Sequence, residues 1–205
     1  MKNVLAVSAC LKRCSVAISY GGNLYEVNEH IDAAANLVWL ADTLVKSNKI
    51  DLGRIDGIIA ASGPGSFTGI RVALSFAKGL ALALRLPATS VSYFDIIRSL
   101  CSGVDYQNVL VAVKGEGNTV YLQRCHQDGS PLVAFQKSID SVEVPYGITL
   151  AGDAAEEIAS HQVNKNARTI CIDDFRDAKY MLNLTQLITR ESQIHPYYLA
   201  KILAF

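Results

Sequence analysis

The order of hydrophobic and polar residues in the first half of the chain predicts three strands, a helix, a strand and a second helix. The apolar run "NVLAVSAC" indicates a buried strand, and "CSVAISY" and "LYEVNEH" alternate around "GGN", the turn of a hairpin. Residues 31–48 place Leu37, Leu40 and Leu44 at helical spacing. The next strand, "IDGIIAAS", leads through a glycine-rich turn into a long apolar helix that Pro87 ends.

The second half of the chain repeats this order. It predicts three strands ("NVLVAVK", "NTVYLQRC" and "LVAFQKS"), then a strand ("ITLAG"), a helix ("DAAEEIASHQ"), a strand ("RTICID") and a helix ("AKYMLNLTQLITRE"). Two βββαβα-type units in tandem predict an α/β protein of two lobes, residues 1–100 and a minimal second lobe of residues 101–205, with a linker near residues 98–108. This order is the pattern of the actin-like ATPase fold, also called the ASKHA or RNase H-like fold.

The glycine-rich turn "SGPGS" before the long helix raises the question of phosphate binding. It does not match a Walker loop, since Ile70 follows Gly69 where that loop requires lysine. The third glycine comes one residue too late for a dinucleotide fingerprint, and Pro64 removes a backbone donor. The free N–H groups of a helix N-terminus still attract anions, so a phosphate site stays an alternative to a structural turn capped by Ser66 or Thr68. The residues of the structural turn are Gly63, Pro64, Gly65 and Gly69.

The helix after the turn carries apolar side chains over most of its circumference. Arg71, Lys78 and Arg85 form a polar stripe at a spacing of seven, and the remaining apolar arc of about 220° is twice what a one-sided helix needs. Either the helix is sandwiched inside this chain, or one of its faces meets another protein. The second interpretation takes the small residues as the contact face and Trp39, on the polar side of the preceding helix, as an anchor. The partner-facing residues predicted in this way are Trp39, Ile70, Ala73, Leu74, Ala77 and Ala81.

Composition and charge narrow the class of protein. Lys and Arg together number 19, as do Asp and Glu, and a net charge of zero argues against a dedicated nucleic-acid binder. The five cysteines form no C-x-x-C pair, which argues for a reducing compartment and leaves any redox role of Cys10 and Cys14 open. No signal peptide is legible, and Arg85 and Pro87 interrupt the longest apolar stretch, so we expect a cytoplasmic protein that does not contact a membrane.

The sequence contains no recognisable motif for catalysis or metal binding. The four histidines are scattered, without an H-E-x-x-H motif or a pair spaced by four residues. The stretch "SGPGS" only resembles a nucleophile elbow, because proline stands in the place of the nucleophile. A Ser-His-Asp or Cys-His nucleophile is never excluded by sequence alone. We expect no catalytic residue, no cofactor and no metal.

One long run carries a family resemblance. The stretch "GPGSFTGIRVALSFAKGLALAL", following "IDGIIAAS", resembles the signature of the TsaB (YeaZ) family, whose members are subunits of the bacterial system for threonylcarbamoyladenosine in tRNA. The stretches "CSVAIS" and "LAGDAAEE" and the terminal "PYYLAKI" resemble segments of the family as well. The resemblance therefore covers essentially the whole chain.

The resemblance implies an actin-like fold without an active site of its own. Such a subunit pairs with a TsaD-like transferase, which transfers the threonylcarbamoyl group with a bound metal, and a TsaE-like ATPase docks on the pair. The helices that correspond to residues 34–47 and 67–86 form the dimer interface of the family. The subunit meets tRNA only indirectly, through the complex, and homodimerisation of the isolated chain is left open.

The sequence departs from the family at two places. Ser8 stands where relatives usually carry an aspartate, and the segment Lys114–Asn118 replaces a "DAR"-like stretch, which leaves residual nucleotide binding and one partner contact open. The function that the resemblance implies is a non-catalytic scaffold for modification of the adenosine beside the anticodon. The alternatives are a stand-alone actin-like enzyme (a small-molecule kinase or ATPase, or a glycoprotease-like peptidase) and a plain homodimeric interaction module.

Overall fold

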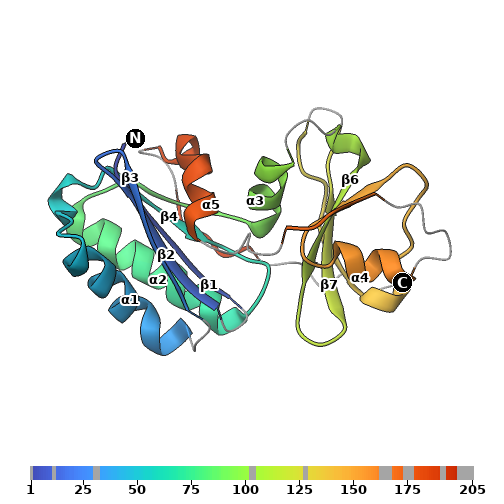
Figure 1. Cartoon of the computed structure of the whole chain (residues 1–205), viewed down its shortest axis with the longest axis horizontal. Helices are drawn as coiled ribbons and strands as arrows, with labels where there is room; N and C mark the ends of the chain where they lie inside the picture. The colour runs from blue at the N-terminus through green and yellow to red at the C-terminus, as the bar shows by residue number, and fades with distance from the viewer. Residues whose placement is uncertain are drawn as a thin grey trace. The chain divides into compact units, whose positions relative to one another are not determined.

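The computed structural model (Figure 1) describes residues 2–10, 13–29, 33–101, 105–126, 129–161, 168–172, 178–189 and 193–197. These residues divide into two compact units. The first unit comprises the described residues up to Tyr93 together with those between 178 and 197, and the second comprises the described residues from Phe94 to 172. The predicted lobes, 1–100 and 101–205, did not anticipate that the chain returns to the first unit after residue 172.

The first unit contains a five-stranded sheet with the order β3-β2-β1-β4-β5. Strands β1 to β3 are antiparallel neighbours, whereas β4 and β5 run parallel to β1. Every residue of β4 is buried, as expected for a continuous apolar run in a strand that is covered on both faces. The strands are β1 (Val4–Cys10), β2 (Arg13–Tyr20), β3 (Asn23–Glu29), β4 (Gly57–Ala61) and β5 (Ala88–Val91).

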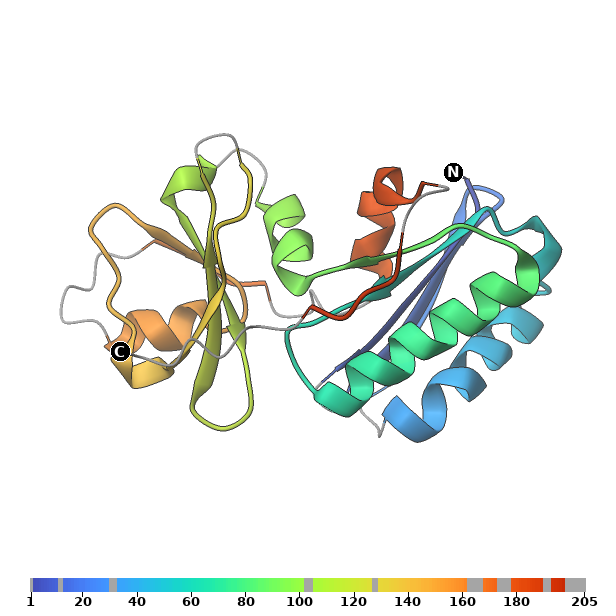
Figure 2. The same cartoon turned by 180° about the vertical axis from the view of Figure 1, so that it is seen from behind.

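Helices cover both faces of this sheet, as Figures 1 and 2 show. On one face α1 (Ala33–Ser47) contacts β2, and α2 (Phe67–Leu84) contacts β1 and β4. On the opposite face lie α5 (Ala178–Met181) and the 3-10 helix η4 (Leu182–Leu187). The sequence pattern predicted these last two as one long helix of the second lobe. The structure instead makes α5 a single turn that packs on β1, β2 and β4 of the first unit.

Polar contacts fasten these late residues to the first sheet. The backbone N–H of Ala178 donates a hydrogen bond to the Oγ of Ser15 at 2.8 Å. The hydroxyl of Ser90 donates to the backbone oxygen of His195 at 2.9 Å and accepts from its backbone N–H at 3.1 Å. Each of these contacts joins residues at least 105 positions apart, so no local pattern in the sequence indicated them.

The second unit repeats the strand order of the first, as β10-β9-β6-β7-β8. Its first three strands are antiparallel neighbours and its last two run parallel to β6. Helix α4 (Ala155–His161) packs on β9 and β10. The prediction of a two-lobed actin-like α/β fold is thereby confirmed. The strands are β6 (Val109–Lys114), β7 (Thr119–Arg124), β8 (Phe135–Ser138), β9 (Thr149–Ala151) and β10 (Arg168–Ile170).

The predicted linker of residues 98–108 contains the end of a helix. Helix α3 (Tyr93–Leu100) begins at the last residue of the first unit, and its other residues belong to the second. The sequence pattern predicted neither α3 nor β5, because both are short and their burial depends on tertiary contacts. The remaining 3-10 helices of the described residues are η1 (Leu52–Arg54), η2 (Tyr106–Asn108) and η3 (Ile139–Ser141).

Candidate protein interface

The turn between β4 and α2 brings the long helix close to its sheet. Gly63 and Gly65 have φ values of +106° and +155°, which glycine adopts without strain. Ser66 caps α2, because its Oγ accepts a hydrogen bond from the N–H of Gly69 at 3.3 Å. A Cβ atom on Gly69 would lie 2.6 Å from the carbonyl oxygen of Ala9. These contacts give the turn a structural role, and phosphate binding there stays an untested alternative.

Five of the six residues predicted to face a partner lie in the core of the first unit instead. Ala73 and Ala77 are 0% exposed, and α2 contacts β1 and β4. Small side chains allow the helix to approach its own sheet closely, which is the same property that suggested a partner. The prediction that these five residues contact a partner is therefore wrong. The alternative, in which they pack inside this chain, is confirmed for them. The buried residues are Ile70, Ala73, Leu74, Ala77 and Ala81.

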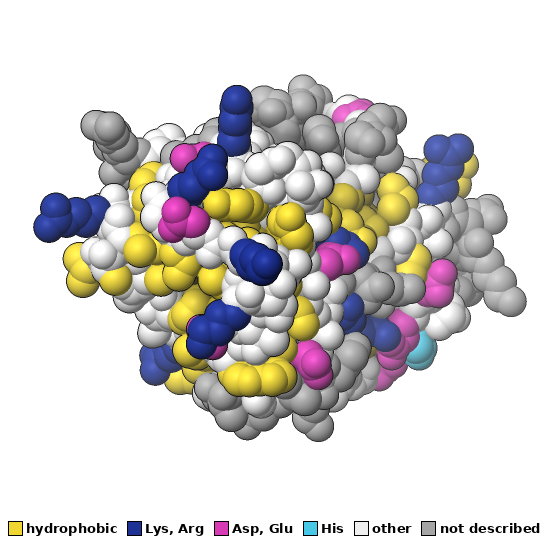
Figure 3. All heavy atoms as spheres, turned by 60° about the vertical axis from the view of Figure 1, so that its left-hand side comes forward, with side chains coloured by type: hydrophobic (Ala, Val, Ile, Leu, Met, Phe, Trp, Pro, Cys, Tyr) yellow, Lys and Arg dark blue, Asp and Glu magenta, His cyan; other side chains and the backbone are white. Residues whose placement is uncertain are grey.

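The other side of α2 and the exposed side of α1 carry large apolar side chains at the surface. On α2, Phe67 is 58% and Leu82 is 82% exposed, and on α1, Val38 is 61% and Trp39 is 57% exposed. In the view of Figure 3, hydrophobic side chains lie at the surface among Lys and Arg and also among Asp and Glu. Trp39 is accessible as an anchor, and its contact with a partner stays a prediction. We refer to the surface of Val38, Trp39, Phe67, Arg71, Lys78, Leu82 and Arg85 as the outer face.

Sequence reasoning missed the apolar members of the outer face on α2, although a signal for them was present. At 100° per residue, Phe67, Arg71, Lys78 and Leu82 fall within an arc of about 60°. Apolar side chains therefore share the side of the helix that carries the cations. From the sequence pattern, we interpreted the cations as a polar stripe outside the contact face. In the structure, exposed apolar side chains lie on the same side of the helix as these cations.

The outer face is basic as well as apolar. Helix α2 contains Arg71 and Lys78 and no Asp or Glu, and Arg85 follows it as the C-cap in the left-handed conformation. The guanidinium carbon of Arg71 lies 3.6 Å from the centre of the Phe67 ring, which is a cation–π contact. The arrangement suits a partner surface that is apolar and carries negative charge.

Ser8 of β1 and Tyr93, the first residue of α3, form a pair of hydroxyl groups. The Oγ of Ser8 and the phenolic oxygen of Tyr93 lie 2.9 Å apart, and both side chains are buried. Hydroxyl groups are neutral at ordinary pH, and the hard cations that accompany phosphates prefer carboxylate oxygens. Ser8 therefore offers a hydrogen-bonded hydroxyl group and no carboxylate at this position.

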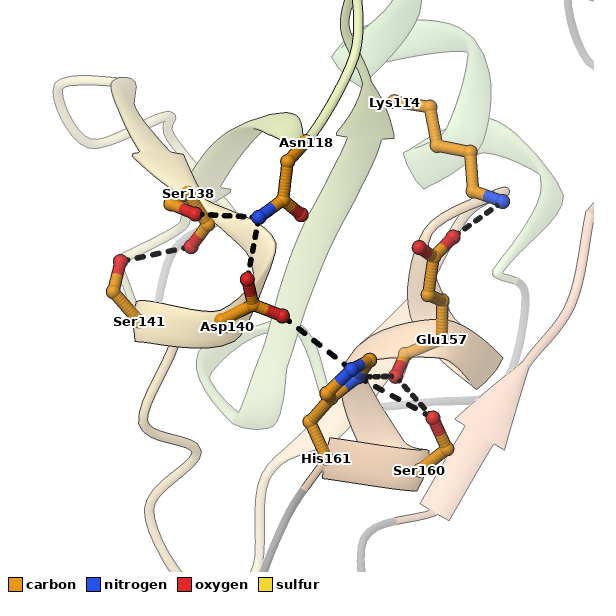
Figure 4. A network of polar contacts seen from close by, with 8 residues as sticks. All are labelled: Lys114, Asn118, Ser138, Asp140, Ser141, Glu157, Ser160 and His161. Atoms are coloured by element: carbon orange, nitrogen blue, oxygen red, sulfur yellow. Dashed lines mark hydrogen bonds and ion pairs between the residues drawn. The ribbon is translucent and has the colours of Figure 1, made fainter.

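Lys114, the first residue of the segment Lys114–Asn118, contacts α4 and also Asp153 in the turn before that helix. The Nζ of Lys114 lies 2.7 Å from the Oε2 of Glu157 (Figure 4). The backbone N–H of Lys114 donates to the Oδ1 of Asp153 at 2.8 Å. The side chain of Lys114 is thus paired within the second unit.

The other end of this segment joins a polar network around η3. The Nδ2 of Asn118 donates to the Oγ of Ser138 at 2.9 Å and also to the carboxylate of Asp140 (Figure 4). The Nε2 of His161 at the end of α4 lies 3.4 Å from the same carboxylate. These side chains are exposed and contact one another, and they connect the β6–β7 turn with α4.

The thiol groups of Cys14 and Cys101 are buried. Burial, and then the negative charge of Glu29, raise the pKa of Cys14 to about 11, so its thiol stays protonated near neutral pH. Burial also raises the pKa of Cys101. The side chain of Cys10 and the whole of His30 lie outside the described residues. Within the described part of the chain, no three His, Cys, Asp or Glu side chains gather as a metal site requires.

Helix α2 is long and apolar enough to cross a membrane, by length and composition only. Its inner residues belong to the core of the first unit, and this packing accounts for much of its apolar character. The expectation that the chain does not contact a membrane stays a prediction.

The sequence matches proteins of tRNA modification. A family model described as "TsaD: tRNA N6-adenosine threonylcarbamoyltransferase" matches residues 26–181. The chain is 28% identical over 124 residues to the tRNA threonylcarbamoyladenosine biosynthesis protein TsaB of Haemophilus influenzae, covering 59% of this chain and 52% of that protein. It is 34% identical over 145 residues to the tRNA N6-adenosine threonylcarbamoyltransferase of Methylocapsa acidiphila, covering 62% of this chain and 40% of that protein. The chain spans about half the length of the curated relatives it matches.

The fold is also found in a solved structure. YeaZ from Pseudomonas aeruginosa superimposes with a TM-score of 0.74, over 97% of this chain and 100% of that chain, at 22% identity. At this level of identity the likeness shows the fold alone. The sequence match to the family model covers most of the chain and includes α1 and α2. The chain therefore belongs to the family that the TsaD model describes, and TsaB proteins are among its relatives.

Proposed function

We propose that this chain is a non-catalytic subunit of the machinery that makes N6-threonylcarbamoyladenosine in tRNA. It pairs with a TsaD-like transferase and supports the activity of that transferase together with a TsaE-like ATPase in the cytoplasm. It meets tRNA only through the complex. The names of the relatives suggest the pathway, and the observation that carries the pairing is the exposed, apolar outer face of α1 and α2.

Covering the outer face would supply binding energy. Full burial of one large apolar side chain is worth about 1.5–3 kcal/mol. Val38, Trp39, Phe67 and Leu82 are each between 57% and 82% exposed, so a complementary partner would bury most of their surface. On the order of these transfer energies, burial of the four side chains would contribute several kcal/mol to binding. The entropy lost on association offsets part of this gain. Aromatic anchors such as Trp39 commonly contribute most to such contacts.

The hydroxyl pair of Ser8 and Tyr93 supports the non-catalytic part of the proposal. In actin-like ATPases an acid at the end of the first strand helps to hold magnesium and phosphate. Here the corresponding side chain is neutral, buried and hydrogen-bonded at 2.9 Å to a tyrosine. A subunit that leaves the chemistry to its partner has no need of the acid.

The test is restoration of tRNA modification in a cell depleted of its own TsaB, with the transferase from the source of this chain co-expressed. Mass spectrometry of digested tRNA measures the modified nucleoside. We expect the wild-type chain to restore it, and Trp39→Glu and Leu82→Glu to fail, because each places a charge in an apolar contact. Val133→Glu is the matched control, since Val133 is 75% exposed and lies in the second unit. Restoration by both outer-face variants at the wild-type level would contradict the proposed pairing surface.

An assay of the purified chain for ATP hydrolysis and protein cleavage distinguishes the proposed subunit from a stand-alone enzyme. We expect the chain alone neither to hydrolyse ATP nor to cleave protein. ATP hydrolysis that survives further purification, and that a point substitution in this chain abolishes, would overturn the proposal and favour the actin-like enzyme.

A further inference from the structure

We propose that strand β3 of the first unit binds an extended segment of another protein, which adds a strand to the five-stranded sheet and carries a lysine or arginine toward Glu29. The proposal does not rest on the proposed function, since that function uses α1 and α2 and leaves β3 without a role. It names a second surface of the chain and the chemistry of the segment that fits it.

Strand β3 exposes main-chain groups along one of its sides. It is the last strand of its sheet, so only β2 pairs with it among the described residues. Gly21 and Gly22, with φ values of +58° and +85°, form a two-residue hairpin turn that places Tyr20 opposite Asn23. The pair that flanks such a turn is hydrogen-bonded, and hydrogen bonds then recur at every second residue. The residues between them, whose backbone N–H and C=O groups point away from β2, are Leu24, Glu26 and Asn28, and we refer to these as the outward residues.

No other part of the described chain satisfies the main-chain groups of the outward residues. Outside the β2–β3 ladder, the backbone of β3 makes no hydrogen bond with a described residue. Leu24 is 54% exposed, so this part of the edge is open to solvent. In the free chain water hydrates these groups, and an added strand replaces the water with a second ladder of hydrogen bonds.

The other sheet edges of the protein are protected against strand addition. The edge strands β8 and β10 have four and three residues, and β8 exposes Lys137. Beside the edge strand β5, the hydroxyl of Ser90 exchanges two hydrogen bonds with the backbone of His195. Short strands, lysines and covering segments are the devices that natural sheets use at their edges. Strand β3 has seven residues and contains neither lysine nor proline, so among these edges it is the one suited to strand addition.

The side chains of β3 favour a segment with apolar residues at alternate positions. Tyr25 and Val27 are half-buried and pack on the core of the first unit, on the face of the sheet that α1 covers. Leu24 lies on the opposite face, because side chains alternate along a strand. An added strand places its own side chains beside these, and aromatic or β-branched pairs across strands are stabilising. The segment therefore carries apolar side chains opposite Tyr25 and Val27.

The charges of β3 indicate a cation on the segment. Of its two carboxylates, that of Glu26 lies 3.2 Å from the Nζ of Lys179. Glu29 takes part in no ion pair with a described residue, and its negative charge contributes, after burial, to the raised pKa of Cys14. A lysine or arginine on the added strand near Glu29 balances this carboxylate.

A second copy of the chain fits this edge less well than a basic segment does. Pairing of two copies through the same edge joins two β3 strands, each of which contains two carboxylates and no cation. The added β3 therefore offers Glu29 no partner charge. Pairing between two copies is an outcome that the experiment distinguishes.

The test uses the full chain and a synthetic peptide of the same length as β3, in which valine and threonine alternate and a lysine stands at each end. NMR measures the exchange of each amide hydrogen of the chain as the peptide is added at millimolar concentration. Exchange at the outward residues should slow by roughly tenfold or more at saturation, because their N–H groups then donate to the peptide. Exchange at Tyr25 and Val27 should not change, because their N–H groups already donate to β2.

Two matched peptides test the two parts of the proposal. A peptide with glutamate in place of each lysine should bind roughly threefold or more weakly at low salt, and the difference should shrink at high salt. A peptide whose backbone nitrogens are all methylated has no N–H group to donate, and it should not slow exchange at the outward residues.

Substitutions in the chain locate the contact. Leu24→Pro removes an outward N–H group and leaves the β2–β3 ladder its hydrogen bonds, so it should weaken peptide binding by roughly tenfold or more. Val133→Pro is the control, since Val133 is also an exposed apolar residue and lies in the second unit, and it should leave binding unchanged. Circular dichroism checks that both variants are folded. Leu24→Lys, which repels the lysines of the peptide and blocks the edge, serves as the second variant and should weaken binding as well.

Any of four results would overturn the inference. The lysine peptide leaves exchange at the outward residues unchanged at millimolar concentration, or it slows exchange at Tyr25 and Val27 as much as at the outward residues. The glutamate peptide binds as tightly as the lysine peptide at low salt. Protection of the outward residues appears without peptide and grows with the concentration of the chain, which would assign the edge to a second copy.

Discussion

A Cβ atom at Gly69 would stand 2.6 Å from the carbonyl oxygen of Ala9. The first turn of α2 therefore lies directly on β1, at a separation that only glycine permits. This contact helps to set the rotation of the helix about its axis. In this rotation Ala73 and Ala77 are buried against the sheet and the outer face is exposed.

Gly69→Ala should lower the free energy of unfolding by about 1–3 kcal/mol, because the added methyl group overpacks the contact with β1. Gly79→Ala is the control within the same helix, since no atom lies within 4 Å of a Cβ at that position. Its effect should be an increase of up to about 1 kcal/mol from helix propensity. Denaturant titrations measure both variants, and equal stability of the two would argue against the close approach.

Two further variants separate the inner side of α2 from its exposed side. Ala77→Glu places a charge where the side chain is 0% exposed, so it should destabilise the first unit by several kcal/mol, on the order of the cost of an uncompensated buried charge. Ser75→Glu changes an exposed position and should leave the fold intact. Thermal unfolding followed by circular dichroism compares them. A stably folded Ala77→Glu chain would be incompatible with the core position of this residue.

Asp56 predicts a dependence of stability on pH. The backbone N–H groups of Asn3 and Lys2 each donate to its carboxylate at 2.9 Å, and these bonds lower its pKa. Because the pKa is lower in the folded chain, the stabilisation is present above the unfolded pKa and is lost as pH falls through the folded pKa. Asp56→Asn should therefore be less stable than wild type near neutral pH, and the difference should shrink below about pH 4. Urea titrations on either side of that pH measure it, and a difference that is independent of pH would refute the assignment.

The cysteines should differ in their rates of alkylation. A pKa of about 11 for Cys14 leaves roughly one thiolate in a thousand at pH 8. Cys171 is exposed, and its thiol is accessible to reagents. Iodoacetamide should therefore modify Cys171 in the folded chain and Cys14 only after denaturation, as peptide mass spectrometry can follow. Equally fast modification of both in the folded chain would speak against the burial of Cys14.

The order of the main elements and the family could be predicted from the sequence, because these features leave local signals. A strand buried on both faces, such as β4, requires a continuous apolar run, and a glycine-rich hairpin separates β2 from β3. The repeated order then predicted two lobes. The short elements β5 and α3 left no such signal, and the packing of residues 178–189 on the first sheet depends on contacts such as that between Ala178 and Ser15.

The sequence by itself determined that residues 67–84 form an apolar helix with Arg71 and Lys78 on one side, since these properties follow from residue spacing. Only the tertiary structure decided which side of this helix is buried. Both the alanine side, at Ala73 and Ala77, and the side of Phe67 are apolar, and hydrophobic burial has no preferred direction. The backbone contact between Gly69 and Ala9 does have a direction, because close approach is open only where a side chain is missing. It buries the alanines in the core of the first unit and leaves Phe67 exposed.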